Sequence, residues 1–72
     1  MSNEVEAEKV QKAFEKFKDL LTEREQEVIM RFYGIQPHVR NSLAEIGERF
    51  KVTRERIRQI KTIALIKLKV KK

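Results

Sequence analysis

Chain breakers are scarce in this sequence, because its 72 residues include only two glycines and one proline. A β-sheet needs a turn after every strand, and glycine and proline supply many of those turns. Apolar residues instead recur at spacings of three and four, the period of an amphipathic α-helix. We therefore expect a single all-α domain over residues 1–72, a short four-helix domain whose acidic, polar first few residues are disordered.

The first two helices are indicated by an apolar stripe and a capping box. Thr22 and Glu25 have the capping-box spacing, in which the hydroxyl and the carboxylate each accept a backbone N–H, and Gly34 ends the second helix. The residues expected to face the core are Val10, Ala13, Phe14, Phe17 and Leu21 in the first helix and Val28, Ile29, Phe32 and Tyr33 in the second.

The segment from Ser42 to Leu68 has the pattern of a helix-turn-helix. Ser42 and Glu45 form a second capping box, and Thr53 can cap a fourth helix without a reciprocal partner, because residue 56 is an arginine. The residues expected to face the core are Leu43, Ile46 and Phe50 in the third helix and Ile57, Ile60, Ala64 and Leu68 in the fourth.

The turn between these two helices has its own signature. Gly47 has no side chain where the helices cross, and Val52 is the apolar residue that plugs the turn. Many such motifs carry glycine at the position of Lys51, because the backbone there adopts a positive φ that other residues tolerate less often. A helical hairpin with no DNA function is the alternative interpretation.

Positive charge is concentrated at one end of the chain. Residues 51–72 hold nine basic side chains and one acid, Glu55, whereas residues 1–50 hold eight basic and ten acidic ones. The basic end predicts an anionic partner. On charge alone, nucleic acid, an anionic membrane, an acidic protein and a merely solvated face all remain open.

The start of the fourth helix carries side chains suited to reading DNA. The second helix of a helix-turn-helix presents its first residues to base edges in the major groove. Here these residues are Arg54, Glu55, Arg58 and Gln59. Arginine pairs with guanine, glutamate accepts from cytosine and glutamine pairs with adenine. A carboxylate repels phosphates, so Glu55 indicates a base contact; the alternative is a favourable interaction with the helix dipole.

The segment VTRERIRQI at residues 52–60, preceded by SLAEIGERF at residues 42–50, resembles region four of the sigma-70 family of bacterial initiation factors. The likeness continues through LTERE at residues 21–25 and YGI at residues 33–35, and it covers roughly residues 8–70. It implies a helix-turn-helix that recognises the minus-thirty-five promoter element in double-stranded DNA.

The resemblance also implies roles for individual residues. Arg54, Glu55 and Gln59 would lie at base edges, with Arg58 near bases or phosphates. The expected contacts to the DNA backbone are Arg24, Ser42, Leu43, Thr53 and Arg56.

RNA polymerase is the second partner that the resemblance implies. In this family an apolar groove of the earlier helices receives the flap tip of the polymerase β subunit. Phe14, Phe17 and Phe32 could line such a groove or belong to the core, and periodicity does not separate the two. An activator or an anti-sigma protein is a further expected partner.

Two departures from the family pattern bear on these roles. An ungapped alignment places Phe32 where the family usually has a phosphate-binding arginine, with Arg31 beside it. Ile63, Ile66 and Val70 replace basic residues of the outer face of the last helix. We expect these three to form an apolar stripe that contacts a protein partner or packs on the opening helix.

Two other functions compete with promoter recognition. A phage-like or anti-sigma-type regulator would use the same fold to occupy the polymerase flap with little DNA binding. Residues 61–72, where lysine alternates with apolar residues, could instead form a membrane-surface helix, although no membrane partner is our expectation.

Catalysis and targeting lack sequence support. There is no cysteine, no glycine-rich phosphate loop and no metal-ligand spacing, and His38 is the single histidine. We expect neither an enzyme nor a bound metal or cofactor. No run of residues is apolar enough to span a membrane, which favours a cytoplasmic location.

Overall fold

A computed structural model of the chain describes the backbone of residues 3–70 and the side chains of residues 6–70. The prediction of an all-α fold is confirmed, because this part of the chain contains helices and no strand. The prediction of a disordered start falls partly on residues 1–2, outside the described residues, and helix already begins at Asn3. The elements are α1 (Asn3–Phe17), the short 3-10 helix η1 (Lys18–Leu20), α2 (Glu23–Tyr33), α3 (Leu43–Phe50) and α4 (Arg54–Lys67).

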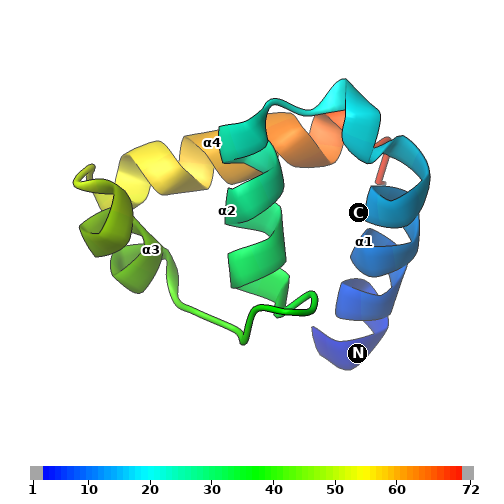
Figure 1. Cartoon of the computed structure of the whole chain (residues 1–72), viewed down its shortest axis with the longest axis horizontal. Coiled ribbons are helices and arrows are strands. Elements are labelled where there is room, and N and C mark those ends of the chain that lie inside the picture. The colour runs from blue at the N-terminus through cyan, green and yellow to red at the C-terminus, as the bar shows by residue number, and fades with distance from the viewer. Residues whose placement is uncertain (1–2, 71–72) are drawn as a thin grey trace.

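The helix α4 is the element on which the others are arranged. Figure 1 shows α4 running across the molecule, with α3 at its first half and α2 crossing it near the middle. The helix α1 stands at the far end of the molecule from α3, where α4 ends. None of the helices within residues 3–70 is long and apolar enough to cross a membrane.

The core consists of two clusters of buried side chains that meet at Phe32. One cluster joins α1, α2 and the second half of α4, and the other joins α2, α3 and the first half of α4. Phe32 packs against both. The larger cluster contains Val10, Phe14, Leu21, Ile29, Tyr33, Ile35, Ala64 and Leu68, and the smaller contains Val28, Ile46, Ile57 and Ile60.

Side-chain caps begin three of the helices, as the sequence predicts. The hydroxyl of Thr22 accepts the N–H of Glu25 at 3.1 Å, and the Glu25 carboxylate accepts the N–H of Thr22 at 2.9 Å. Ser42 and Glu45 form the same reciprocal pair at the start of α3. Thr53 caps α4 through the N–H of residue 56 at 3.1 Å without a reciprocal bond.

Three helices end in the same way, with one residue in the left-handed conformation followed by an apolar residue. The N–H of that apolar residue bonds to the carbonyl five residues earlier, which is the Schellman arrangement. The left-handed residues are Gly34 (φ 67°), Lys51 (φ 60°) and Lys69 (φ 61°). The apolar residues that follow them, Ile35, Val52 and Val70, all pack against the core. The expected positive φ at Lys51 is therefore confirmed.

The end of α4 corrects the prediction for Val70. The helix stops at Lys67, and the left-handed Lys69 reverses the chain so that Val70 folds back against the larger cluster. Val70 therefore does not continue a helical stripe with Ile63 and Ile66. Helical periodicity could not predict this, because it assumes that the helix continues.

Gly47 is confirmed as the point of close approach between α3 and the start of α4. A Cβ atom at this position would lie 2.7 Å from the backbone oxygen of Val52. Backbone atoms cannot swing away as the end of a side chain can. Any larger residue would therefore separate α3 from the turn that positions α4.

Candidate nucleic-acid interface

The first two turns of α4 are divided sharply into a buried and an exposed side. Ile57 and Ile60 are buried in the smaller cluster. The four side chains that the sequence predicts to read bases are all exposed to solvent: Arg54, Glu55, Arg58 and Gln59. We call these four residues the readout quartet. Because the opposite side of α4 is anchored, the quartet is held outward by a rigid helix.

The exposed face continues beyond the quartet with less charge. Glu55, Gln59, Thr62 and Ile66 follow one another at steps of four, three and four residues, so they form one row along α4. Ile63 lies beside this row. The exposed fractions of Ile63 and Ile66 are 45% and 70%, and neither side chain is among those that pack on the larger cluster, to which α1 contributes.

Glu55 and Arg58 are paired with each other. The Arg58 Nε donates to Glu55 Oε1 at 2.9 Å, and Arg58 Nη2 donates to Glu55 Oε2. These hydrogen bonds from Arg58, with help from Gln59 and the charge of Arg54, hold the pKa of Glu55 below its usual value. The spacing of three residues within a helix could have predicted this pair.

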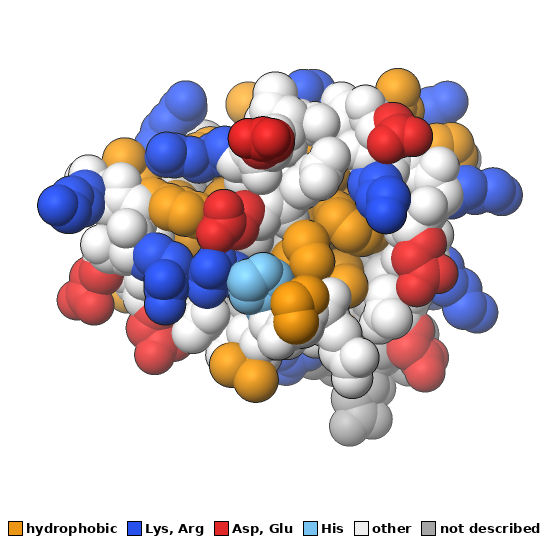
Figure 2. Space-filling model, in the orientation of Figure 1, with side chains coloured by type: hydrophobic (Ala, Val, Ile, Leu, Met, Phe, Trp, Pro, Cys, Tyr) orange, Lys and Arg blue, Asp and Glu red, His pale blue; other side chains and the backbone are white. Residues whose placement is uncertain are grey.

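Basic and acidic side chains alternate on the surface at the end of the molecule that contains the helix-turn-helix (Figure 2). Figure 2 shows Lys and Arg side chains at the end of the molecule that α3 and the start of α4 form, with acidic side chains between them. Arg24, from the start of α2, places its guanidinium 4.7 Å from the centre of the Phe50 ring on α3. This cation–π contact ties one candidate backbone-binding residue to the helix-turn-helix.

The other candidate backbone contacts lie at the starts of α3 and α4. Ser42, Thr53 and Arg56 are exposed, whereas the Leu43 side chain packs against the smaller cluster. Any contact from Leu43 must therefore come from its backbone N–H, which lies in the first turn of α3 and has no helical acceptor. The hydroxyls of Ser42 and Thr53 already accept their capping bonds.

Arg31, which lies beside the departure from the family pattern at Phe32, is paired with an acid of its own helix. Its guanidinium bonds to the Glu27 carboxylate, with Nη2 2.9 Å from Oε2. The Phe32 side chain is half-buried, with the Lys61 ammonium 4.6 Å from its ring centre and the Tyr33 ring edge-on at 4.9 Å. The Phe32 ring therefore packs within the domain and leaves part of its surface exposed.

The remaining candidates for partner contact differ in exposure. Phe14 has an exposed fraction of 5% and belongs to the larger cluster, so of the two alternatives, groove and core, the structure places it in the core. Phe17 is half-buried, and the ammonium groups of Lys16 and Lys69 lie 5.9 Å and 5.6 Å from its ring centre. Phe17 therefore presents part of an aromatic surface between two cations.

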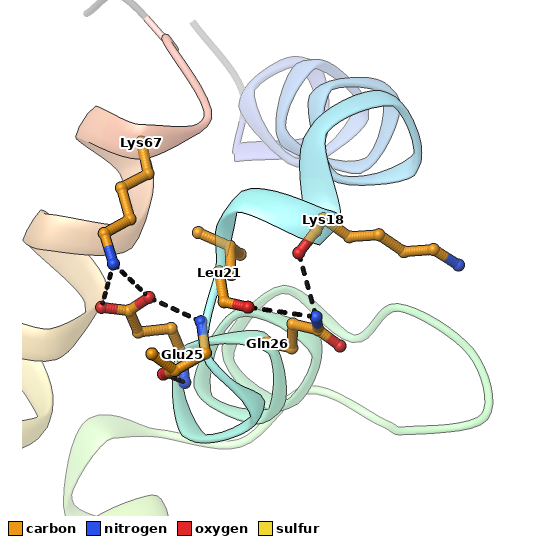
Figure 3. A network of polar contacts seen from close by, with 6 residues as sticks. Lys18, Leu21, Glu25, Gln26 and Lys67 are labelled. Carbon is orange, nitrogen blue, oxygen red and sulfur yellow. Dashed lines mark hydrogen bonds and ion pairs between the residues drawn. The ribbon is translucent and has the colours of Figure 1, made fainter.

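One contact that supports the interface was missed by sequence reasoning. The Lys67 ammonium, near the end of α4, lies 2.9 Å and 3.0 Å from the two carboxylate oxygens of Glu25 at the start of α2 (Figure 3). Gln26 beside it donates to the carbonyl of Lys18 at 2.9 Å. Lys67 and Glu25 are 42 residues apart in sequence, so no local pattern could have indicated their ion pair.

The structure also explains the ionisation of Glu25. Burial raises its pKa, but the hydrogen bonds from Lys67 and from the Thr22 N–H outweigh burial, so the pKa lies below its usual value. Glu25 is thus a carboxylate that caps α2 and holds α4 at the same time.

Comparisons with known proteins identify the family. The family model described as Sigma-70, region 4 matches residues 19–70. Similar proteins include RNA polymerase sigma factor SigA4 of Synechococcus elongatus, 52% identical over 50 residues, which are 69% of this chain and 16% of that protein. SigA of Lactococcus lactis subsp. cremoris is 45% identical over 51 residues, which are 71% of this chain and 14% of that protein.

A longer match comes from SigA of Microcystis aeruginosa, which is 42% identical over 67 residues, or 93% of this chain and 16% of that protein. The chain spans about a sixth of the length of these relatives. The family model covers most of the chain, and the resemblance to region four of the sigma-70 family is confirmed. This chain belongs to the sigma-70 region 4 family.

Proposed function

We propose that this domain binds promoter DNA and reads the minus-thirty-five element with α4 in the major groove. The observation that carries the proposal is the sharp division of α4, with the readout quartet exposed and Ile57 and Ile60 buried behind it. Arg54 pairs with guanine, Glu55 accepts from cytosine N4 and Gln59 pairs with adenine. Arg58 lies near bases or phosphates. Membership of the sigma-70 region 4 family supports promoter binding.

The proposal assigns the neighbouring groups to the DNA backbone. Helix starts are favourable places for phosphates, because their N–H groups lack helical acceptors and the helix dipole is positive there. Leu43 contributes its backbone N–H, and the exposed Arg56 and Arg24 contribute charge. Ser42 and Thr53 position the two helix starts through their capping bonds and lie beside the same phosphates.

Fluorescence anisotropy tests this function on the full chain. A labelled duplex containing TTGACA and a duplex of the same composition in scrambled order are titrated at several salt concentrations. We expect tighter binding to the first duplex, because each mismatched base pair removes about 1–3 kcal/mol of binding free energy. Affinity for both duplexes should fall with salt, by about 0.9 logarithmic units per phosphate contact for each tenfold rise. Equal affinity for the two duplexes would contradict base readout.

We further propose that the domain docks on the β flap of RNA polymerase. The names of its relatives, RNA polymerase sigma factors, support a polymerase partner. The exposed parts of Phe17 and Phe32 are the aromatic surface that an apolar flap helix would contact. Binding of the chain to a purified flap fragment, measured for the wild type and for Phe17→Ala, tests this. Circular dichroism of the variant checks that the fold is retained, and undiminished flap binding by the folded variant would contradict the assignment of Phe17.

A second candidate function is a regulator that binds polymerase and hardly touches DNA. The exposed Ile63 and Ile66 favour it, because they extend the face of α4 with apolar surface that a protein such as an activator or an anti-sigma factor could cover. The same anisotropy titration separates the two functions. A chain that binds the flap fragment but neither duplex is the regulator.

A further inference from the structure

Glu55 is the only acid among residues 51–72, and it lies in the centre of the readout quartet. Its carboxylate accepts two hydrogen bonds from one guanidinium, that of Arg58. The side chains of Glu55 and Arg58 remain 58% and 52% exposed, so the pair lies on the surface that faces a duplex. Because both side chains are exposed, burial does not force this pair to form. The pair neutralises the positive charge of Arg58 within the quartet.

When a duplex approaches, the Arg58 guanidinium can bind either the Glu55 carboxylate or a DNA phosphate. A guanidinium binds carboxylate and phosphate with the same forked geometry. Glu55 therefore competes with DNA phosphates for Arg58, and the competition is intramolecular. Arg58 is thus less available to phosphates while Glu55 is in place.

Cognate and noncognate DNA differ in what they offer Glu55. Every duplex offers phosphates to Arg58, but only a suitably placed cytosine offers an N4 donor to the carboxylate. On noncognate DNA, Arg58 can bind a phosphate only if Glu55 loses its two hydrogen bonds from Arg58 beside a negatively charged backbone. On cognate DNA, cytosine replaces Arg58 as the donor to Glu55, and Arg58 becomes free for a further contact.

We propose that Glu55 determines specificity mainly by suppressing noncognate binding, because it holds Arg58 until a base donor replaces that arginine. This inference rests on the proposed function of promoter readout. It differs from a plain base contact in one respect. A base contact alone raises affinity for the cognate duplex and leaves the scrambled duplex unaffected, whereas Glu55 as proposed here lowers affinity for the scrambled duplex.

The test is Glu55→Gln, which removes the charge and keeps the shape of the side chain. The matched control is Glu15→Gln, which changes the net charge equally but lies on α1, at the opposite end of the molecule from α3 and the start of α4 (Figure 1). Both side chains are exposed, and circular dichroism checks that both variants fold. Affinities for the TTGACA duplex and the scrambled duplex are measured by anisotropy across a salt series.

We expect Glu55→Gln to bind the scrambled duplex about two- to fivefold more tightly than wild type at low salt, the range that exposed ion pairs span. The salt dependence on that duplex should steepen by about one phosphate contact. Glu15→Gln should change both quantities less. The gain should shrink when Glu55→Gln is combined with Arg58→Ala, because the arginine that Glu55 restrains is then absent.

The possible outcomes distinguish failure of the Glu55 role from failure of promoter readout itself. If wild type discriminates between the duplexes and Glu55→Gln leaves scrambled binding no tighter than Glu15→Gln does, the suppression role is overturned and base readout stands. If wild type itself binds both duplexes equally, the proposed function fails first, and the role of Glu55 in specificity fails with it. A gain on the scrambled duplex that is unchanged without Arg58 also overturns the inference.

Discussion

The Lys67 ammonium lies 2.9 Å from one carboxylate oxygen of Glu25 and 3.0 Å from the other, joining the end of α4 to the start of α2 across 42 residues of sequence. The contact fixes α4 at the end remote from the readout quartet. Since Gly47 and the turn after α3 fix the other end, α4 is held at both ends.

Replacing Lys67 with methionine should lower the free energy of unfolding by about 1 kcal/mol, because the pair is partly buried and therefore stronger than a typical surface ion pair. Methionine keeps the apolar stem of lysine. For a domain of this size the melting temperature should fall by about 4–8 °C. Thermal denaturation followed by circular dichroism measures this. Lys9→Met, which changes an exposed lysine of α1, is the control, and equal melting of the two variants would contradict a role for the pair.

The same pair predicts how acid affects stability. Burial raises the pKa of Glu25, but the bonds from Lys67 and Thr22 bring it below the usual 4.5. A carboxyl group whose pKa is lower in the folded protein stabilises the fold above its unfolded pKa, and this contribution is lost as the pH falls through the folded pKa. Urea unfolding at neutral pH and again well below pH 4.5 should show the gap between wild type and Lys67→Met closing. A gap that stays constant would show that Lys67 acts through packing alone.

Gly47→Ala should destabilise the domain by about 1–3 kcal/mol, because the new methyl group would overlap the Val52 carbonyl and the backbone would have to shift. Since the same shift displaces α4, binding to the TTGACA duplex should weaken in the folded fraction as well. Urea unfolding and anisotropy measure the two effects. Glu48→Ala, at an exposed site of the same helix, should leave stability within about 0.5 kcal/mol of wild type.

Ile66→Lys should leave the melting temperature unchanged, because the isoleucine side chain is 70% exposed and packs against neither cluster. Ile60→Lys on the buried side of the same helix should unfold the domain, because it places an unpaired charge in the smaller cluster. Thermal melts of both variants provide the comparison. A melting temperature several degrees lower for Ile66→Lys would contradict the proposal that the exposed Ile66 side chain contacts a partner and not the domain itself.

Arg54→Ala and Arg24→Ala should affect DNA binding in different ways. Loss of a bidentate contact to guanine at Arg54 should weaken cognate binding by about 1–3 kcal/mol and relax the preference at one base pair. Loss of a phosphate contact at Arg24 should weaken binding to all duplexes alike and reduce the salt slope by about one contact. A panel of duplexes with single base changes, titrated by anisotropy, distinguishes the two patterns. Loss of preference in Arg24→Ala would contradict its assignment to the backbone.

The readout quartet and the starts of α2, α3 and α4 could be predicted from the sequence because their signals are local. The capping boxes at Thr22 and Ser42 depend on residues three positions apart, and the buried side of α4 depends on spacings of three and four. The left-handed turn at Lys51 is likewise a property of the few residues around it. The roles of the quartet on DNA remain predictions for the titrations above.

Interactions between distant segments could not be predicted in this way. Phe14 and Phe17 share one apolar stripe, yet only Phe14 is fully covered, because coverage depends on where α2 and α4 lie. Val70 lies at a helical spacing from Ile66, yet the chain reverses at Lys69 and buries part of its side chain.

The sequence by itself determined where α2, α3 and α4 begin and which side chains the first turns of α4 direct outward, because those properties follow from interactions within about one turn of helix. Only the tertiary structure decided that Lys67 meets Glu25, that Phe32 joins the two clusters and that Ile63 and Ile66 stay uncovered. The physical reason is that burial and ion pairing between separate helices depend on how the helices pack. Residues far apart in sequence set that packing together.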